Sequence, residues 1–177
     1  MDNHLSKLFL MEIQQQCKFA ISDYTRLALA ISIPDNYALF HLLQSFLIAA
    51  ANISKILWPM KSYAQRGQDL RSSLSIDETS PLKTKNPRNI FEHFDERLEE
   101  WYTQSPHHNI VDMSSGITDD MGIDGHVDFI RYFNSATYTF IFRGYRYEIN
   151  PLYIAIKDLL TKVNNELSKP PSMSFPP

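Results

Sequence analysis

The sequence predicts a mainly α fold: an antiparallel helical bundle of about four long helices, with a small antiparallel β-meander before the last helix. Three observations lead to this prediction. Apolar residues recur at helical spacing over long stretches, only 5 of the 177 residues are glycine, and strand-forming residues gather near 129–149. A chain of this length can bury a core, so we expect a single domain over 1–168 and a flexible, proline-rich tail over 169–177.

Two long helices open the predicted bundle. The first spans residues 5–30, where apolar side chains recur at helical intervals. Pro34 stops it, because the residue before a proline avoids the helical region. Asp35 or Asn36 caps the second helix, which runs until the next proline stops it. Since only a short turn joins them, the two helices are expected to pack antiparallel.

The second helix is the most apolar segment, yet we predict a buried core helix and not a membrane span. Polar residues that are costly in a bilayer interrupt it: His41, Gln44, Asn52 and Lys55. Charged residues among the first apolar ones do not resemble a signal peptide. The single cysteine, Cys17, excludes an internal disulfide and suits a reducing cytosol. We therefore expect a cytoplasmic protein without membrane contact, in which Cys17 is a small buried hydrophobe.

A mixed, basic connector follows, with a short helix expected around residues 65–74. Asn86 and Pro87 then give a clear helix start, with the asparagine as cap and the proline in the first turn. The helix that they begin is predicted over residues 87–102.

The β-meander and the last helix complete the predicted domain. Strand formers between 129 and 149 are interrupted by Arg143 and Gly144, which supply a turn. Asn150 and the proline after it then start a helix over residues 152–167.

The motif that carries chemistry is the run from Arg88 to His93, with the sequence RNIFEH. The guanidinium of Arg88 offers a planar fork of donors to a phosphate, and the helix N-terminus adds positive potential. The imidazole of His93 can accept or donate a proton near neutral pH. With Asn89 as an orienting polar group, these residues could bind a phosphodiester and move a proton without a metal.

An arginine, a polar residue, any three residues and a histidine at the start of a core helix make the chain resemble the HEPN superfamily. The resemblance covers roughly residues 5–102 and implies a small helical bundle. In catalytic members, two protomers bring their arginines and histidines into one cleft and cut RNA without a metal. The resemblance assigns Arg88 to the phosphate, His93 to acid–base catalysis and Asn89 to orientation. It also implies a cyclic phosphate product and no cleavage of DNA.

The same residues also admit a purely structural interpretation. Arg88 pairs naturally with Glu92 one turn later, and His93 suits a solvated helix face. The exposed side of this helix is acidic, which should repel RNA: Glu92, Asp95, Glu96, Glu99 and Glu100.

Asp95 also stands where superfamily toxins silenced by nucleotide modification often carry a tyrosine. A long segment follows the motif helix, whereas the motif helix is usually nearer the domain end.

Other chemistries are weaker predictions. Histidines and acids downstream of the motif could ligate a metal, but the usual spacings are missing; they are His107, His108, Asp112, Asp119, Asp120, Asp124, His126 and Asp128. The run at 119–125 lacks the spacing and closing glutamate of a calcium loop, so a solvated turn is expected. The aromatic meander could stack bases, although a packed sheet face is the favoured interpretation.

The sequence thus predicts a HEPN-like, metal-independent RNA-cleaving or RNA-binding protein that acts as a homodimer. Its setting would be toxin–antitoxin or defence, and its catalytic residues would be Arg88, His93 and Asn89. We expect no cofactor and no metal; RNA and an antitoxin or other protein are the expected partners. The alternative is a non-catalytic helical interaction domain, with the acidic helix face, the aromatic meander and the tail as contact surfaces.

Overall fold

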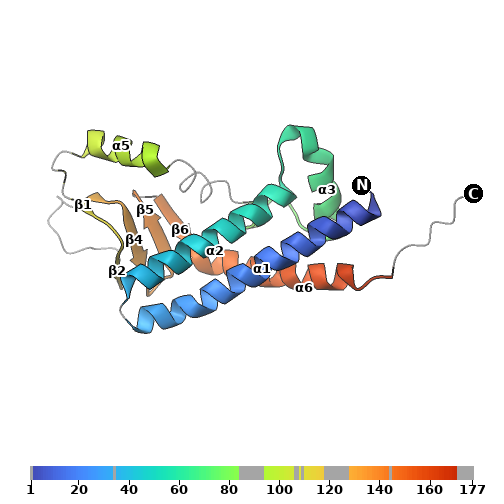
Figure 1. The fold of residues 1–177 in the computed structure, drawn as a ribbon, viewed down its shortest axis with the longest axis horizontal. Coiled ribbons are helices and arrows are strands. Elements are labelled where there is room, and N and C mark those ends of the chain that lie inside the picture. Colours follow the sequence, from blue (N-terminus) through green and yellow to red (C-terminus); the bar gives the residue numbers. More distant parts are fainter. Residues whose placement is uncertain are drawn as a thin grey trace, which may run out of the picture.

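The computed structural model describes residues 2–33, 35–83, 94–105, 108, 110–117, 128–143 and 145–170. These residues are mostly helical, as predicted, with a small sheet before the last helix (Figure 1). The described helices are α1 Asn3–Ser32, α2 Asn36–Leu57, the 3₁₀ helix η1 Lys61–Tyr63, α3 Ala64–Ser73, α5 Phe94–Gln104 and α6 Ile149–Leu167. The described strands are β1 Ile110–Val111, β2 Ser114–Gly116, β3 Asp128–Phe129, β4 Arg131–Asn134, β5 Thr139–Phe142 and β6 Tyr145–Glu148.

Three long helices form the bundle. α1 runs antiparallel to both α2 and α6 and packs against each of them, while α5 lies apart from them beside the sheet (Figure 1). Hydrogen bonds between amide side chains join α1 to its neighbours, from Gln14 to Asn164 at 2.7 Å and from Asn52 to Gln16 at 3.3 Å. A bundle of four long helices is therefore not confirmed within the described part of the chain.

Local caps explain where the first two helices begin. The Asp2 carboxylate accepts hydrogen bonds from the backbone N–H groups of His4 and Leu5, so α1 begins before the predicted residue 5. Asp35, one of the two predicted caps, accepts from the N–H of Ala38 at 3.0 Å. The α1–α2 hairpin is thus confirmed, with a slightly longer first helix.

The core lies between the three long helices. Cys17 on α1 is fully buried, as predicted. It belongs to a buried face at helical spacing, made of Leu10, Ile13, Cys17, Ala20 and Leu27. Leu8, Met11 and Phe19 lie on the outer side of the same helix and are about half exposed. Among the described helices, α2 is the one long and apolar enough to cross a membrane by length and composition. Most of its length is buried against the rest of the fold.

The last helix begins three residues earlier than predicted, at Ile149. Asn150 and Pro151 were predicted to precede the helix, but both lie in its first turn, and Glu148 at the cap position makes no capping hydrogen bond with its side chain. The Asn150 side chain instead accepts a hydrogen bond from the hydroxyl of Tyr24 on α1. This contact, distant in sequence, ties the first turn of α6 to α1.

The sheet has the strand order β2-β4-β5-β6. β4, β5 and β6 form the predicted antiparallel meander, and β2 pairs with β4 in parallel, so the sheet is mixed. β1 and β3 form a separate parallel pair. Phe140 and Phe142 project from the same face of β5. Phe140 contacts Phe40 of α2, and Phe142 contacts Phe94 of α5, so both helices meet this face of the sheet.

Candidate functional site

The three motif residues, Arg88, Asn89 and His93, lie outside the described residues. So does the first part of the predicted 87–102 helix; its described part is α5, which extends to Gln104. The structure describes the segments on both sides of the motif, which end at residue 83 and begin again at residue 94. The contacts of these two segments are the framework that would hold a site between them.

Directly after the motif, Phe94 packs on two neighbouring side chains of the sheet, Phe142 of β5 and its cross-strand partner Arg131 of β4. Its ring centroid lies 6.1 Å from that of Phe142, and the Arg131 guanidinium carbon lies 5.1 Å above the Phe94 ring. Both ends of the Arg131 fork donate to the Asp112 carboxylate, with an Nε–Oδ1 distance of 2.8 Å. This bidentate pair fixes the guanidinium plane on which Phe94 rests. The residue that follows His93 is thereby anchored.

A second arginine secures the other end of α5. Arg143, in the turn after β5, donates to Glu100 at 2.7 Å and to Gln104 at 2.9 Å. Arg97 donates to the same carboxylate at 2.7 Å. Hydrogen bonds from Arg143, and then from Arg97, lower the pKa of Glu100 below its usual value. α5 is therefore tied to the sheet at both ends.

The chain before the motif is anchored by Glu78. Its carboxylate accepts from the Lys83 ammonium at 2.7 Å and from the Trp58 indole at 3.0 Å, and Arg71 lies 2.9 Å away. The hydrogen bond from Lys83 is the main cause of the lowered pKa of Glu78. Leu82 beside it is buried. Residues 84–93, which carry the motif, thus connect two fixed points.

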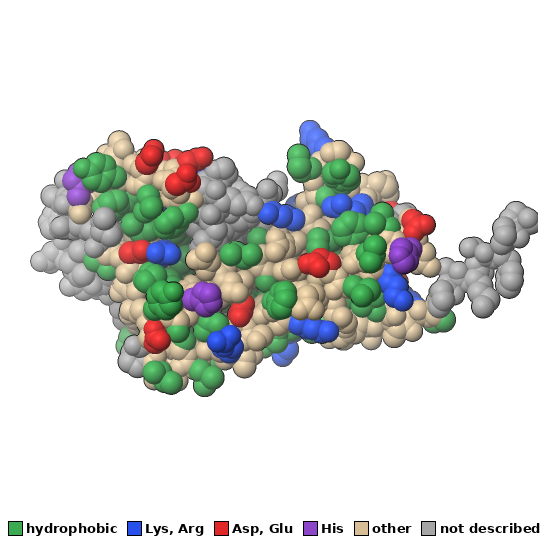
Figure 2. All heavy atoms as spheres, viewed as in Figure 1, with side chains coloured by type: hydrophobic (Ala, Val, Ile, Leu, Met, Phe, Trp, Pro, Cys, Tyr) green, Lys and Arg blue, Asp and Glu red, His purple; other side chains and the backbone are tan. Residues whose placement is uncertain are grey.

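The outer face of α5 is acidic, as the sequence predicted. Figure 2 shows the acidic side chains gathered over this helix. Asp95 and Glu99 are exposed, and within the described part of the chain neither forms an ion pair. An RNA strand approaching the motif from this side would meet these unneutralised carboxylates.

The described residues give no support to the alternative metal site, because they contain no group of three potential ligands. His108 stacks on Tyr102 with ring centroids 4.4 Å apart, and Asp112 is bound to Arg131. The remaining candidate ligands have side chains outside the described set: His107, Asp119, Asp120, Asp124, His126 and Asp128.

Most aromatic side chains of the meander are packed inside the fold. Tyr132, Phe133, Phe140 and Phe142 are buried, so their rings cannot stack on bases. Tyr145 on β6 is the exposed exception, at 68%.

A hollow of about 490 Å³ lies where the connector meets the start of α6. Leu47, Pro81, Arg146 and Glu148 are among its lining residues. Sequence spacing did not indicate it, because it joins segments far apart in the chain.

Comparison with protein-family models, with curated proteins and with solved structures finds no match. The resemblance to the HEPN superfamily therefore stays a prediction that Arg88, Asn89 and His93 carry.

Proposed function

We propose that this protein is a HEPN-like, metal-independent ribonuclease or RNA-binding protein that acts as a homodimer. The observation that carries the proposal is the Arg88-Asn89-x3-His93 spacing directly before helix α5 in a mainly helical chain. Two features of the described framework support it. α5 is fixed to the sheet through Phe94 and Glu100, and the preceding connector is fixed through Glu78, so a motif between them would be held in place.

The proposed chemistry needs no cofactor. His93 accepts the proton of a ribose 2′-hydroxyl, whose oxygen attacks the neighbouring phosphorus. The bond to the 5′-oxygen breaks, that oxygen receives a proton from a protonated His93 imidazole, and a 2′,3′-cyclic phosphate remains. Arg88 binds the phosphate oxygens and stabilises their charge in the transition state. Asn89 orients the imidazole, and the second protomer completes the cleft.

The direct test is cleavage of RNA by the purified chain in EDTA, beside Arg88→Ala and His93→Ala. We expect a cyclic phosphate product from the wild type and a loss of roughly a hundredfold or more in rate from His93→Ala, because a general acid–base group contributes about this much. Arg26→Ala and His41→Ala remove the same residue types at exposed positions and should retain activity. RNA that stays intact at high wild-type concentration would end the nuclease proposal.

A specific observation also favours the alternative of an interaction domain. Leu98 and Tyr102 are exposed on the outer face of α5, at 38% and 63%, next to its carboxylates. Exposed aromatic and apolar residues on one helix face suit a protein partner such as an antitoxin. A stoichiometric partner that binds Arg88→Ala and His93→Ala as well as the wild type would favour this function over RNA cleavage.

A further inference from the structure

A half-buried arginine marks one surface that the proposed function does not use. The Arg66 guanidinium carbon lies 4.5 Å from the centroid of the Phe9 ring and 5.2 Å from that of Tyr63. Its Nε atom is buried without a hydrogen-bond partner, and among the described residues Arg66 forms no ion pair. Two aromatic rings thus hold a positive charge that pairs with no carboxylate among the described residues.

The residues around Arg66 extend this surface. Met60 and Tyr63 are exposed, at 77% and 59%, and Lys61 between them is exposed and positively charged. We call Met60, Lys61, Tyr63 and Arg66 the basic–apolar patch. Arginine, tyrosine and methionine are enriched at protein interfaces, so this composition suits a partner that brings carboxylates and apolar side chains.

The chain itself carries a surface of that chemistry. Asp95, Leu98, Glu99 and Tyr102 follow the spacing of a single helix face, and all four are exposed on α5. We call these four residues the acidic–apolar face. Trp101, on an adjacent side of α5, is buried.

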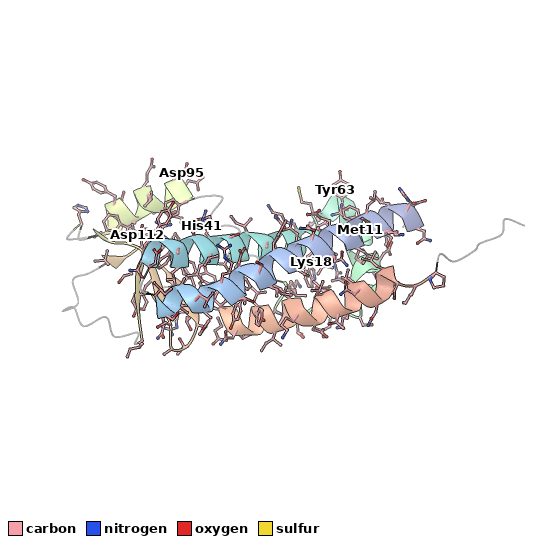
Figure 3. The ribbon with its side chains drawn as sticks, turned by 60° about the horizontal axis from the view of Figure 1, so that its bottom comes forward. Met11, Lys18, His41, Tyr63, Asp95 and Asp112 are labelled. Atoms are coloured by element: carbon pink, nitrogen blue, oxygen red, sulfur yellow. The ribbon has the colours of Figure 1, made fainter. Side chains whose placement is uncertain are left out.

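Both surfaces lie on the same long side of the molecule, at opposite ends. Figure 1 places α5 above the sheet near one end and α3 above the long helices near the other, and Figure 2 shows all atoms in the same view. In the rotated view of Figure 3, Asp95 and Tyr63 again lie at the two ends of this side. A two-fold axis that is parallel to this side and perpendicular to its long direction turns the side of one copy to face that of the other and exchanges the ends. The acidic–apolar face of each copy then lies over the basic–apolar patch of the other, and the contact is made twice.

We propose that two copies of this chain associate in this way, with α5 of each copy docked on the basic–apolar patch of the other. The carboxylates of Asp95 and Glu99 pair with Lys61 and Arg66, and the apolar side chains of the two surfaces pack together. Opposite charges at both contacts steer the two copies together and fix their orientation. The charges and the exposed side chains of the two surfaces are the evidence for this pairing. It therefore does not depend on whether the chain cleaves RNA.

The test measures the oligomeric state of the full chain by sedimentation velocity over a range of concentrations. The wild type is expected to dimerise at low salt and to dissociate more readily in roughly 0.5 M salt, where charges are screened within a few ångströms. Arg66→Glu and Glu99→Lys are each expected to raise the dimer Kd by roughly tenfold or more, because each places like charges opposite one another. Lys61→Glu, at an exposed position, checks the same contact without touching the buried Nε. Arg26→Glu on α1 is the matched charge reversal and should leave the Kd unchanged.

Mixing the two variants gives the sharpest result. In a one-to-one mixture of Arg66→Glu and Glu99→Lys, one contact is native and the other has its charges exchanged, so the heterodimer should form although each variant alone is mainly monomeric. A wild-type chain that stays monomeric would overturn the proposal. A dimer that survives both reversals, or a mixture that does not associate, would overturn it as well. This inference rests on the proposed function in one respect, the homodimer, so a monomeric wild type would end both. A dimer that survives both reversals overturns only this interface, and loss of RNA cleavage with an intact dimer overturns only the nuclease.

Discussion

The hydroxyl of Tyr24 donates a hydrogen bond of 2.5 Å to the side-chain oxygen of Asn150, which joins α1 to the first turn of α6. The Tyr24 ring also stacks on Tyr153, with centroids 3.7 Å apart and planes 7° from parallel. Burial raises the pKa of Tyr24 above its usual value, so the hydroxyl keeps its proton and stays a donor. This contact holds the start of α6 where no side chain caps it.

Removal of that hydroxyl should weaken the fold. Tyr24→Phe keeps the stacked ring but leaves the Asn150 acceptor without its donor, and we expect a loss of about 0.5–1.5 kcal/mol in the free energy of unfolding. Urea denaturation measures the difference. Tyr37→Phe makes the same change at a side chain that is 76% exposed and should be neutral. Equal losses for the two variants would show that the Tyr24–Asn150 bond contributes nothing.

Much of the fold could be predicted because its signals are local. Apolar spacing, Asp35 and the prolines define the first hairpin within a few residues of its observed bounds. The start of α6 was predicted three residues late, and the side chain of Asn150 bonds to Tyr24, 126 residues away, which no local pattern indicates. β2, at Ser114–Gly116, carries no strand formers and is held by backbone pairing with β4. Pairing between distant segments leaves no periodic trace in the sequence.

The candidate site shows the same division. Arg88, Asn89 and His93 form a pattern within six consecutive residues, so the sequence alone suggests the chemistry. The groups that anchor the neighbouring helix are remote from it in the chain. Arg143 reaches Glu100 across 43 residues, and no local spacing distinguishes that carboxylate from the other acids of α5. Contacts of this kind, between residues far apart in the chain, are found only in the three-dimensional structure.

Gly67 should reverse the usual rule for glycine in a helix. Alanine normally stabilises a helix interior relative to glycine by about 1 kcal/mol. A Cβ on Gly67, however, would lie 2.4 Å from the Pro59 ring and 2.7 Å from the Leu57 carbonyl oxygen. We expect Gly67→Ala to destabilise the protein by roughly 1–3 kcal/mol, because backbone must move to relieve the overlap. Thermal unfolding tests the sign, with the exposed Gln68→Ala as the control; a stabilised Gly67→Ala would refute this packing.

The ion pair beneath Phe94 should contribute to stability. Asp112→Asn keeps the shape of the side chain but leaves the partly buried Arg131 guanidinium without its carboxylate. We expect a loss of about 1–3 kcal/mol, typical of a hydrogen-bonded charge that loses its partner. Asp23→Asn, on α1, is the matched neutralisation. If urea denaturation gives both variants the same midpoint, Arg131 does not depend on Asp112.

Cys17 should be chemically inert in the folded protein. Burial raises the pKa of its thiol to about 12, so almost none of it is thiolate near neutral pH, and no reagent reaches it. We expect no labelling by a disulfide reagent in buffer and one labelled thiol per chain in urea. A Cys17→Ser/Ser22→Cys double variant moves the thiol to the exposed side of α1 and should label at once. Native Cys17 that reacted as fast as this control would contradict its burial.

The lowered pKa of Glu100 predicts a specific loss of stability in acid. A carboxyl whose pKa is lower in the folded than in the unfolded chain contributes stability above its usual value of 4.5, and this is lost as the pH falls through the folded-state pKa. Wild type should therefore be more stable than Glu100→Gln at neutral pH, and the gap should close below 4.5. Glu99→Gln changes the neighbouring carboxylate, which has no ion pair among the described residues, and should show no such gap. The measurement is the urea midpoint of each variant from neutral pH to below 4.5. A low protein concentration keeps the chains monomeric, because Glu99 belongs to the proposed dimer contact. A gap that stayed constant with pH would mean that Arg143 and Arg97 stabilise the helix without help from the charge of Glu100.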